Sequence, residues 1–410
     1  MGLGSISAVI DSLEFDAGTC GYPHIIHISG EVYAVAYEGV DGDGWLATFT
    51  IDSAGNIGAA VIDTLEFDTV VAAHPRIINV SGTTYAIVYG VESGLSPPTK
   101  IVTVDITAAG QIGAAVIDTF SSAATSTSFP TIVHVSGDYF AVAHEISGNY
   151  GQVFTITITA AGDIGAAETD TLIFETTTCD YPDIIFISGT TYAVAYAGGA
   201  LSGNFSDIGR LCTFDIQTNG QIGAAVIDTL QYETADAFSP RIIQVSGSVY
   251  AIAYSQYNLA AKAYVATVTI NVDGTIDDAV IDTQEIDASD GGTPSIVKIG
   301  SSNLFAIGYR GVDNDGFIKT VNIASNGIIS SVLGTLEFDT ADGLTPSLVL
   351  VPNTTIVAVA YWGVDNDGWV KTAGISLVGE LTGVIAVVQT RLHYVDAYGV
   401  ERFIEGTVVT

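Results

Sequence analysis

The sequence predicts an all-β fold assembled from seven copies of one four-stranded antiparallel unit. A proline recurs every 52 to 58 residues, at Pro23, Pro75, Pro130, Pro182, Pro240, Pro294 and Pro346. A similar segment begins at each proline, such as PRIINVSGTTYAIVY. Two further segments follow it, such as KIVTVDITAAG and IGAAVIDTLEFD. These segments are short, rich in β-branched and aromatic residues, and bounded by Gly, Ser, Asn or Asp, as antiparallel strands are.

Seven four-stranded units of this size predict a seven-bladed β-propeller. The first two segments of each unit (strands A and B) are apolar on both faces, which suits a blade packed between two neighbours. The N-terminal segment SAVIDSLEFD resembles a fourth segment (strand D) without strands A, B and C before it. Residues 5–16 are therefore predicted to complete the seventh blade, in the arrangement known as velcro closure.

The C-terminal end offers a second candidate for the same outer position. Residues 384–388 lie where a strand D of the seventh blade would begin, so the sequence leaves open whether 8–16 or 384–388 fills it. We expect residues 1–382 to form the propeller. Residues 383–410 are expected to form a β-hairpin around DAYG that attaches to a neighbour or caps the propeller.

The composition limits the classes of partner. Asp and Glu total 45 against 11 Lys and Arg, a formal charge of −34, so nucleic acid and membrane insertion are not expected. Cys20, Cys179 and Cys212 form no disulfide framework, and we expect free thiols. No signal peptide is visible, yet the acidic surface favours an extracellular, cell-surface or virion location.

Residues 4–382 resemble β-propeller repeat proteins in architecture and repeat size. The Trp-Asp blade ending of WD40 proteins, the double glycine of Kelch repeats and the SxDxGxTW box of sialidases are all absent. The resemblance implies a wide, flat disc with a narrow axial channel lined by strands A. Propellers serve as enzymes, lectins and docking platforms, so this fold does not decide the function.

Three similar segments precede the third strand (strand C) of blades one, six and seven: GVDGDGW (39–45), GVDNDGF (311–317) and GVDNDGW (363–369). Their paired aspartates are a possible calcium site, but a third acidic position and a distal carboxylate are missing. Asp-Gly and Asn-Asp also favour tight turns, which we predict here. No metal site, cofactor or catalytic residue is predicted, because no nucleophile, base and metal-ligand set has the required spacing.

The residue after each repeated proline is predicted to lie at one mouth of the channel. These residues are His24, Arg76, Thr131, Asp183, Arg241, Ser295 and Ser347. Two arginines and an aspartate around a channel resemble the arginine clusters of sialidases, although a Tyr–Glu pair and a third arginine cannot be placed. Arg76, Asp183 and Arg241 are therefore candidate ligand-binding residues, with an unselected, solvent-filled mouth as the alternative.

Nearly all the length variation among the repeats lies between strands B and C: the glycine of the C–D turn follows the last residue of strand B by 18 to 24 residues. These loops and the D–A connections are predicted to share one face. On that face we expect further ligand-binding residues, namely Tyr22, Trp45, Tyr150, Tyr181, Phe205, Tyr257, Phe317, Trp362, Trp369 and Asp41. Aromatic rings beside carboxylates stack on and hydrogen-bond sugars; the alternative is that these rings shield blade edges.

The sequence therefore favours a non-enzymatic structural or adhesive propeller. Its variable-loop face is expected to bind a glycan or a protein, and residues 384–410 are expected to pair at a sheet edge and support self-association. The alternative is a secreted carbohydrate-active enzyme, a hydrolase or lyase, with its site at the channel mouth.

Overall fold

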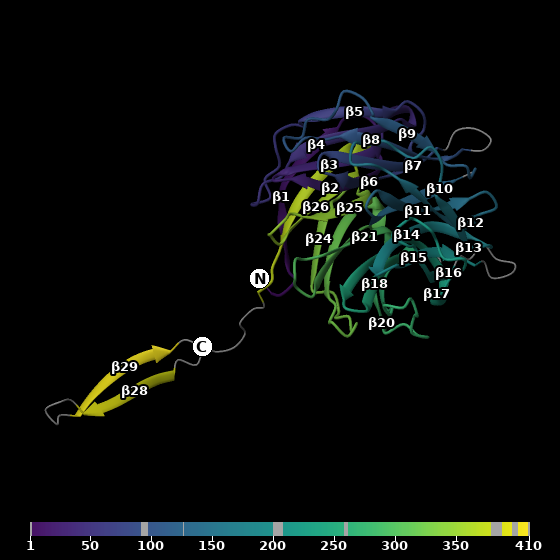
Figure 1. Cartoon of the computed structure of the whole chain (residues 1–410). Coiled ribbons are helices and arrows are strands. Elements are labelled where there is room, and N and C mark those ends of the chain that lie inside the picture. The colour runs from purple at the N-terminus through teal and green to yellow at the C-terminus, as the bar shows by residue number, and fades with distance from the viewer. Residues whose placement is uncertain are drawn as a thin grey trace.

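The computed structural model describes residues 2–91, 97–125, 127–199, 208–257, 261–378, 388–395 and 401–408. Within these residues the protein is almost entirely β-structure, and three short 3₁₀ turns are its only helical elements. The sheets fan out around a central axis as the blades of a propeller (Figure 1). No helix in the described ranges is long and apolar enough to span a membrane.

Blades 1 to 6 are antiparallel sheets whose four strands follow one another in sequence. Blade 1 contains β2 (Gly21–Ser29), β3 (Val32–Glu38), β4 (Gly44–Thr50) and β5 (Asp63–Asp68). Blade 2 contains β6 (Ala73–Ser81), β7 (Thr84–Gly90), β8 (Thr99–Asp105) and β9 (Asp118–Ser121). Blade 3 contains β10 (Ser128–Ser136), β11 (Tyr139–Ile146), β12 (Tyr150–Thr157) and β13 (Asp170–Glu175).

Blades 4 and 5 share one long strand, β17 (Asp228–Ser246), which is strand D of one blade and continues as strand A of the next. Blade 4 also contains β14 (Cys179–Ser188), β15 (Thr191–Gly198) and β16 (Ile208–Asp215), and blade 5 contains β18 (Val249–Tyr257), β19 (Ala261–Thr269) and β20 (Asp282–Asp287). Blade 6 contains β21 (Gly292–Lys298), β22 (Leu304–Arg310), β23 (Gly316–Asn322) and β24 (Gly334–Asp339).

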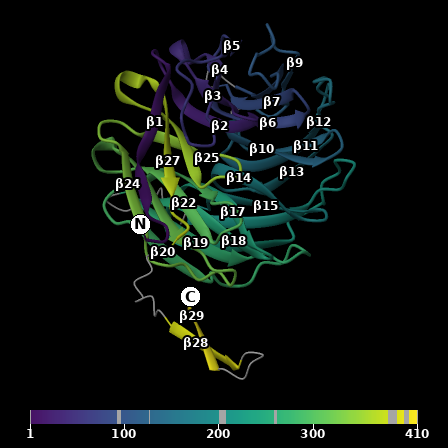
Figure 2. The ribbon, with the colours of Figure 1, turned by 90° about the vertical axis from the view of Figure 1, so that its left-hand side faces the viewer.

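Blade 7 joins the two ends of the propeller. It combines β25 (Leu344–Leu350), β26 (Ile356–Trp362) and β27 (Gly368–Ile375) with the N-terminal strand β1 (Ile6–Asp16), which pairs antiparallel with β27. Figure 2 shows the N-terminal strand β1, in purple, beside β27, which comes from the other end of the propeller sequence. The predicted seven-bladed fold with velcro closure is therefore confirmed, and β1 rather than residues 384–388 fills the outer position.

Adjacent blades are joined by the same hydrogen bond at all seven seams. A threonine in strand C donates its hydroxyl to the carbonyl of the glycine in the C–D turn of the following blade, over 2.5–2.7 Å. The N-terminal segment supplies the seventh such glycine, because Thr320 of blade 6 donates to Gly4. At six seams an aspartate of strand D also accepts the backbone N–H of an isoleucine in the next blade, as Asp11 does from Ile57.

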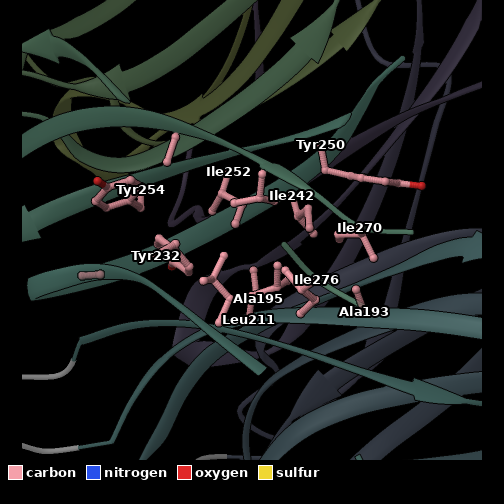
Figure 3. Packing of buried hydrophobic residues seen from close by; sticks show 14 of the residues in the cluster. Ala193, Ala195, Leu211, Tyr232, Ile242, Tyr250, Ile252, Tyr254, Ile270 and Ile276 are labelled. Atoms are coloured by element: carbon pink, nitrogen blue, oxygen red, sulfur yellow. The ribbon is translucent and has the colours of Figure 1, made fainter. Parts of the chain in front are cut away.

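The apolar core is divided among the seams between blades. Figure 3 shows the cluster between blades 4 and 5, in which Leu211 and Ala195 of one blade pack against Ile252 and Ile242 of the next. Tyr254 closes this cluster at one end, and its hydroxyl donates to Glu233 over 2.8 Å. The small alanines of strand B let neighbouring sheets approach closely, so each blade buries its apolar faces only inside the closed ring.

The C-terminal residues form a separate two-stranded sheet. β28 (Val388–Val395) and β29 (Glu401–Val408) pair antiparallel with one another, and among the described residues they pair with no strand of a blade. Figure 1 places this hairpin, in yellow, away from the disc. The predicted C-terminal hairpin is confirmed, whereas the expected pairing with a sheet edge is not found among the strands that the structure describes.

We predict that deletion of residues 1–17 lowers the unfolding midpoint by roughly 10 °C or more, because it removes the buried ring of Phe15, exposes the edge of β27 and breaks the Thr320–Gly4 seam. Thermal unfolding measured by circular dichroism tests this. Deletion of residues 383–410, which removes no strand of a blade, is the control and should leave the midpoint within about 2 °C. Equal midpoints for the two truncations would contradict the closure model.

Candidate binding site

The start of each strand A has the same unusual backbone. The residue before each repeated proline has a φ between 45° and 53° in all seven blades, a region that residues other than glycine rarely adopt. A proline normally pushes the preceding residue towards extended backbone, so each position stores strain of order 1 kcal/mol. These residues are Tyr22, His74, Phe129, Tyr181, Ser239, Thr293 and Thr345. The pairing register of strand A is also interrupted here.

The seven strands A surround a cavity of about 400 Å³ on the propeller axis. Its walls carry most of the residues that flank the seven prolines, and below them lie isoleucines such as Ile77, Ile184 and Ile242. The cavity opens on the variable-loop face, because the start of strand A is level with the end of strand B, as Gly21 pairs with Glu38. A volume of this size falls at the lower end of the range for small-molecule sites.

Aromatic rings occupy one half of the mouth. The Tyr22 and His74 ring centroids are 3.7 Å apart, those of His74 and Phe129 4.5 Å, and those of Phe129 and Tyr181 3.9 Å. We call these four residues the aromatic arc. The equivalent residues of blades 5 to 7 carry hydroxyl groups, and those of Thr293 and Thr345 have no hydrogen-bond partner among the described residues. The mouth is therefore flat and apolar on one side and polar on the other.

The charged groups of the cavity belong to residues that directly follow a repeated proline. Asp183 accepts the Ile242 N–H over 2.8 Å and lies 3.7 Å from the Arg241 guanidinium. Burial raises the pKa of Asp183 to about 6, although the Ile242 N–H and the Arg76 charge favour its ionised form. Burial and the neighbouring Arg76 lower the pKa of both His24 and His74 to about 3. Both imidazoles are therefore neutral at physiological pH.

Five predicted site residues are thus brought together at the cavity: Tyr22, Tyr181, Arg76, Asp183 and Arg241. The sequence analysis missed His74 and Phe129, which complete the aromatic arc. Their signal was present at the residue before each repeated proline, which is aromatic or imidazole in blades 1 to 4 and hydroxyl-bearing in blades 5 to 7.

The other predicted aromatics do not line this cavity. Trp45, Phe317 and Trp369 lie in strands C and pack over the first glycine of their GVD segments. A Cβ at Gly39 would lie 2.3 Å from the Trp45 ring, so that position requires glycine. These contacts correspond to the blade-edge role that was the alternative for these rings.

The remaining predicted residues lie at the loops of the same face. Tyr150 is exposed at the start of β12, and Trp362 donates its indole N–H to Asn366 over 3.1 Å. Asp41 is exposed in a 3₁₀ turn with φ of 60°, which is the tight turn predicted for the GVD segments. Phe205 and the side chain of Tyr257 lie outside the described residues.

The three cysteines are buried free thiols, as predicted. Burial, followed by nearby carboxylates, raises the pKa of Cys20 well above its usual range. Burial and neighbouring acidic groups do the same for Cys179 and Cys212. The un-ionised thiols are poor nucleophiles, so they act as small core residues.

Comparisons with known proteins agree with the fold. No protein-family model and no curated protein matches the sequence. The chain is similar to a provisionally assigned 6-phosphogluconolactonase from Bacteroides fragilis, with a TM-score of 0.56 and 14% identity over 82% of this chain and 95% of that one. It is also similar to a protein of unknown function from Dyadobacter fermentans, with a TM-score of 0.51 and 10% identity over 91% and 100%.

A sialidase from Streptococcus pneumoniae aligns with a TM-score of 0.48 and 9% identity over 88% of this chain and 70% of that one. At these identities the likenesses concern the fold alone, which is that of a β-propeller.

The surroundings of the Arg76 guanidinium predict how its replacement changes the free energy of unfolding. It has no hydrogen bond or ion pair among the described residues, and burial lowers its pKa. Because a half-buried charge without a close partner is partly desolvated, Arg76→Met should raise the free energy of unfolding by about 1 kcal/mol. The control Lys371→Met removes a lysine that is paired with Asp339 over 2.7 Å, and it should destabilise. Chemical denaturation measures both; a destabilising Arg76→Met would show that Arg76 supports the fold.

Proposed function

We propose that this protein is a non-enzymatic structural or adhesive propeller that acts on the outside of a cell or virion. It binds a glycan or protein partner through its variable-loop face, with the axial cavity as the recognition site. The arrangement of the mouth is the observation that carries this proposal. An aromatic arc packs against the apolar face of a sugar ring, while the hydroxyl groups opposite the arc and the carboxylate of Asp183, next to Tyr181, exchange hydrogen bonds with sugar hydroxyls.

The strained backbone around the mouth supports a binding role. All seven side chains before the prolines are held by a conformation that costs energy, and such strain is characteristic of preorganised sites. The closed ring of blades fixes the positions of these seven side chains before a ligand binds, which reduces the entropy lost on binding. The variable loops around the same opening add contacts to the rest of a larger partner.

Binding is tested with a glycan array followed by calorimetry on the sugars it retains. Phe129→Ala removes the centre of the aromatic arc and should weaken binding by roughly tenfold or more, because the sugar loses a flat apolar surface. Tyr150→Ala is the matched control, since this exposed ring lies outside the cavity. If Tyr150→Ala weakens binding and Phe129→Ala does not, the loops rather than the cavity form the site.

The second candidate function is a carbohydrate-active enzyme with its site at the channel mouth. Asp183 favours it, since a buried carboxyl group with a pKa of about 6 is suited to general acid catalysis. Glycoside hydrolysis usually needs two carboxyl groups, and Asp183 is the only one among the described residues that line the cavity. Turnover of glycosides, esters or phosphate esters that is lost in Asp183→Ala or Arg241→Ala would establish the enzyme and overturn our proposal.

We also propose that residues 384–410 mediate self-association. β28 and β29 form a two-stranded sheet, and an unpaired strand edge pairs readily with another chain. Arg391 and Arg402 belong to this segment of an otherwise acidic molecule, and their charges favour contact with the acidic rim of a neighbour.

Truncation after Thr382 tests this role. The shortened chain should remain folded but become monomeric over a concentration series in analytical ultracentrifugation, while the full chain associates. An unchanged size distribution at every concentration would show that the hairpin has no part in assembly.

A further inference from the structure

The residue that directly follows the repeated proline forms a hydrogen bond between blades in five of the seven blades. Its side chain accepts the N–H of the isoleucine or leucine that follows the same position in the next blade. His24 accepts from Ile77, Thr131 from Ile184, Asp183 from Ile242, Ser295 from Leu348 and Ser347 from Ile25, over 2.8–3.3 Å. Because strand A is the innermost strand of each blade, these N–H groups would otherwise lack a partner on the cavity side.

The arginines at this position in blades 2 and 5 do not form this hydrogen bond. Arg76 and Arg241 carry only donors, so they cannot accept the N–H groups of Ile132 and Ile296, which receive no side-chain acceptor among the described residues. Arg241 is partly neutralised by Asp183 at 3.7 Å. Arg76 has neither a hydrogen bond nor an ion pair there, although it is half-buried and lines the cavity. Blades 2 and 3 therefore present a cluster of unused donors to the cavity.

The contacts of Asp183 show how a carboxylate is bound at this position of the cavity wall. One of its oxygens accepts the Ile242 N–H, and the other lies near the Arg241 guanidinium. Arg76 and the Ile132 N–H are the same kinds of donor, but no carboxylate among the described residues forms a hydrogen bond or ion pair with them, and Asp183 acts on Arg76 only at longer range. The recess beside Arg76 is bounded by His74, Phe129 and Tyr181, so the unused donors adjoin the aromatic arc.

We propose that the ligand of the axial cavity is an acidic sugar, whose carboxylate binds Arg76 and the Ile132 N–H while its ring packs against His74, Phe129 and Tyr181. This inference rests on the proposed function and specifies the class of glycan. Arginine pairs with a carboxylate through two parallel hydrogen bonds, which fixes the orientation of the ring. The carboxylate takes the acceptor role that the side chain at this position plays in five other blades.

The formal charge of −34 does not prevent this binding. At physiological ionic strength, charges on the outer rim are screened over about 8 Å, whereas the guanidinium groups act at short range inside a protein-lined cavity. Two arginines against one aspartate leave the cavity with a net positive charge, since His24 and His74 are neutral.

This charge balance makes binding depend on pH. The cavity groups of the seven strands A are His24, His74, Arg76, Asp183, Arg241 and the phenols of Tyr22 and Tyr181. Of these, Asp183 titrates between pH 5 and 7.5, as its pKa is about 6. Protonation at pH 5 removes the internal competitor for the arginines, while a sugar carboxylate with a pKa of about 3.5 stays ionised. Affinity for the acidic sugar should therefore rise as pH falls from 7.5 to 5.

Calorimetric titration of the full chain with matched sugars tests the proposal. The probes are glucuronate, galacturonate and N-acetylneuraminate, compared with glucose, galactose, N-acetylglucosamine and sodium sulfate. We expect at least one acidic sugar to bind about tenfold more tightly than the neutral sugars. Arg76→Gln should abolish that preference, Asp183→Asn should reproduce the pH 5 affinity at pH 7.5, and Arg310→Gln, outside the cavity, should change neither.

The possible failures are distinct. If neutral sugars bind as tightly as acidic ones and Arg76→Gln has no effect, this inference is wrong and the proposed glycan site stands, provided that Phe129→Ala still weakens binding. If sulfate binds as tightly as the acidic sugars, the donors form a general anion site and the assignment to a sugar is overturned. If no sugar binds, both the acidic-sugar inference and the glycan role of the cavity fail.

Discussion

The propeller depends on one repeated contact, the hydrogen bond from a strand C threonine to the carbonyl of a turn glycine in the next blade. The glycine has a φ of 75–91° in every turn, and a Cβ at Gly110 would lie 2.6 Å from Ile62 of the preceding blade. A side chain would thus both strain the turn and separate the blades. The contact fixes the spacing and tilt of the sheets, and closure requires that the N-terminus supply Gly4.

The acidic composition is partly a consequence of how the blades are joined. Six aspartates bind backbone N–H groups across seams, and six further carboxylates accept tyrosine hydroxyls of the following blade, as Asp16 does from Tyr37. Five of the seven blades thus bring two acidic residues as hydrogen-bond acceptors, and blades 2 and 6 bring one each. The sequence analysis attributed the charge to the environment of the protein, and the structure adds this internal role.

The seam between blades 2 and 3 is the exception to the tyrosine pattern. His144 stands where tyrosine stands in the other blades, and it hydrogen-bonds Thr99 and Gln152 rather than a carboxylate. Burial lowers the pKa of His144 to about 4, so the ring is neutral and this seam carries no charge at that point. The departure lies in strand B of blade 3, the blade whose strand A carries Phe129.

The cavity depends on the closed ring of blades, and five of its lining residues also form hydrogen bonds to the next blade. The two positions that flank each proline vary from blade to blade, whereas the seam threonines and glycines do not. Side chains at the mouth are thus free to differ as long as the backbone of strand A is held. This separation explains how a nearly symmetric scaffold carries a strongly asymmetric site, with aromatic rings on one side and hydroxyl groups on the other.

The sequence by itself determined the repeat and the number of blades, because these follow from spacing and from local strand and turn preferences. It favoured residues 5–16 as the strand that closes the ring, with residues 384–388 as the alternative. It also identified Arg76, Asp183 and Arg241 as one ring, since symmetry places equivalent residues around one axis. Only the tertiary structure separated Tyr22 and Tyr181 from Trp45 and Trp369. Whether a ring faces the axis or a neighbouring loop depends on the left-handed backbone before each proline and on contacts between blades, and neither has a local signal in the sequence.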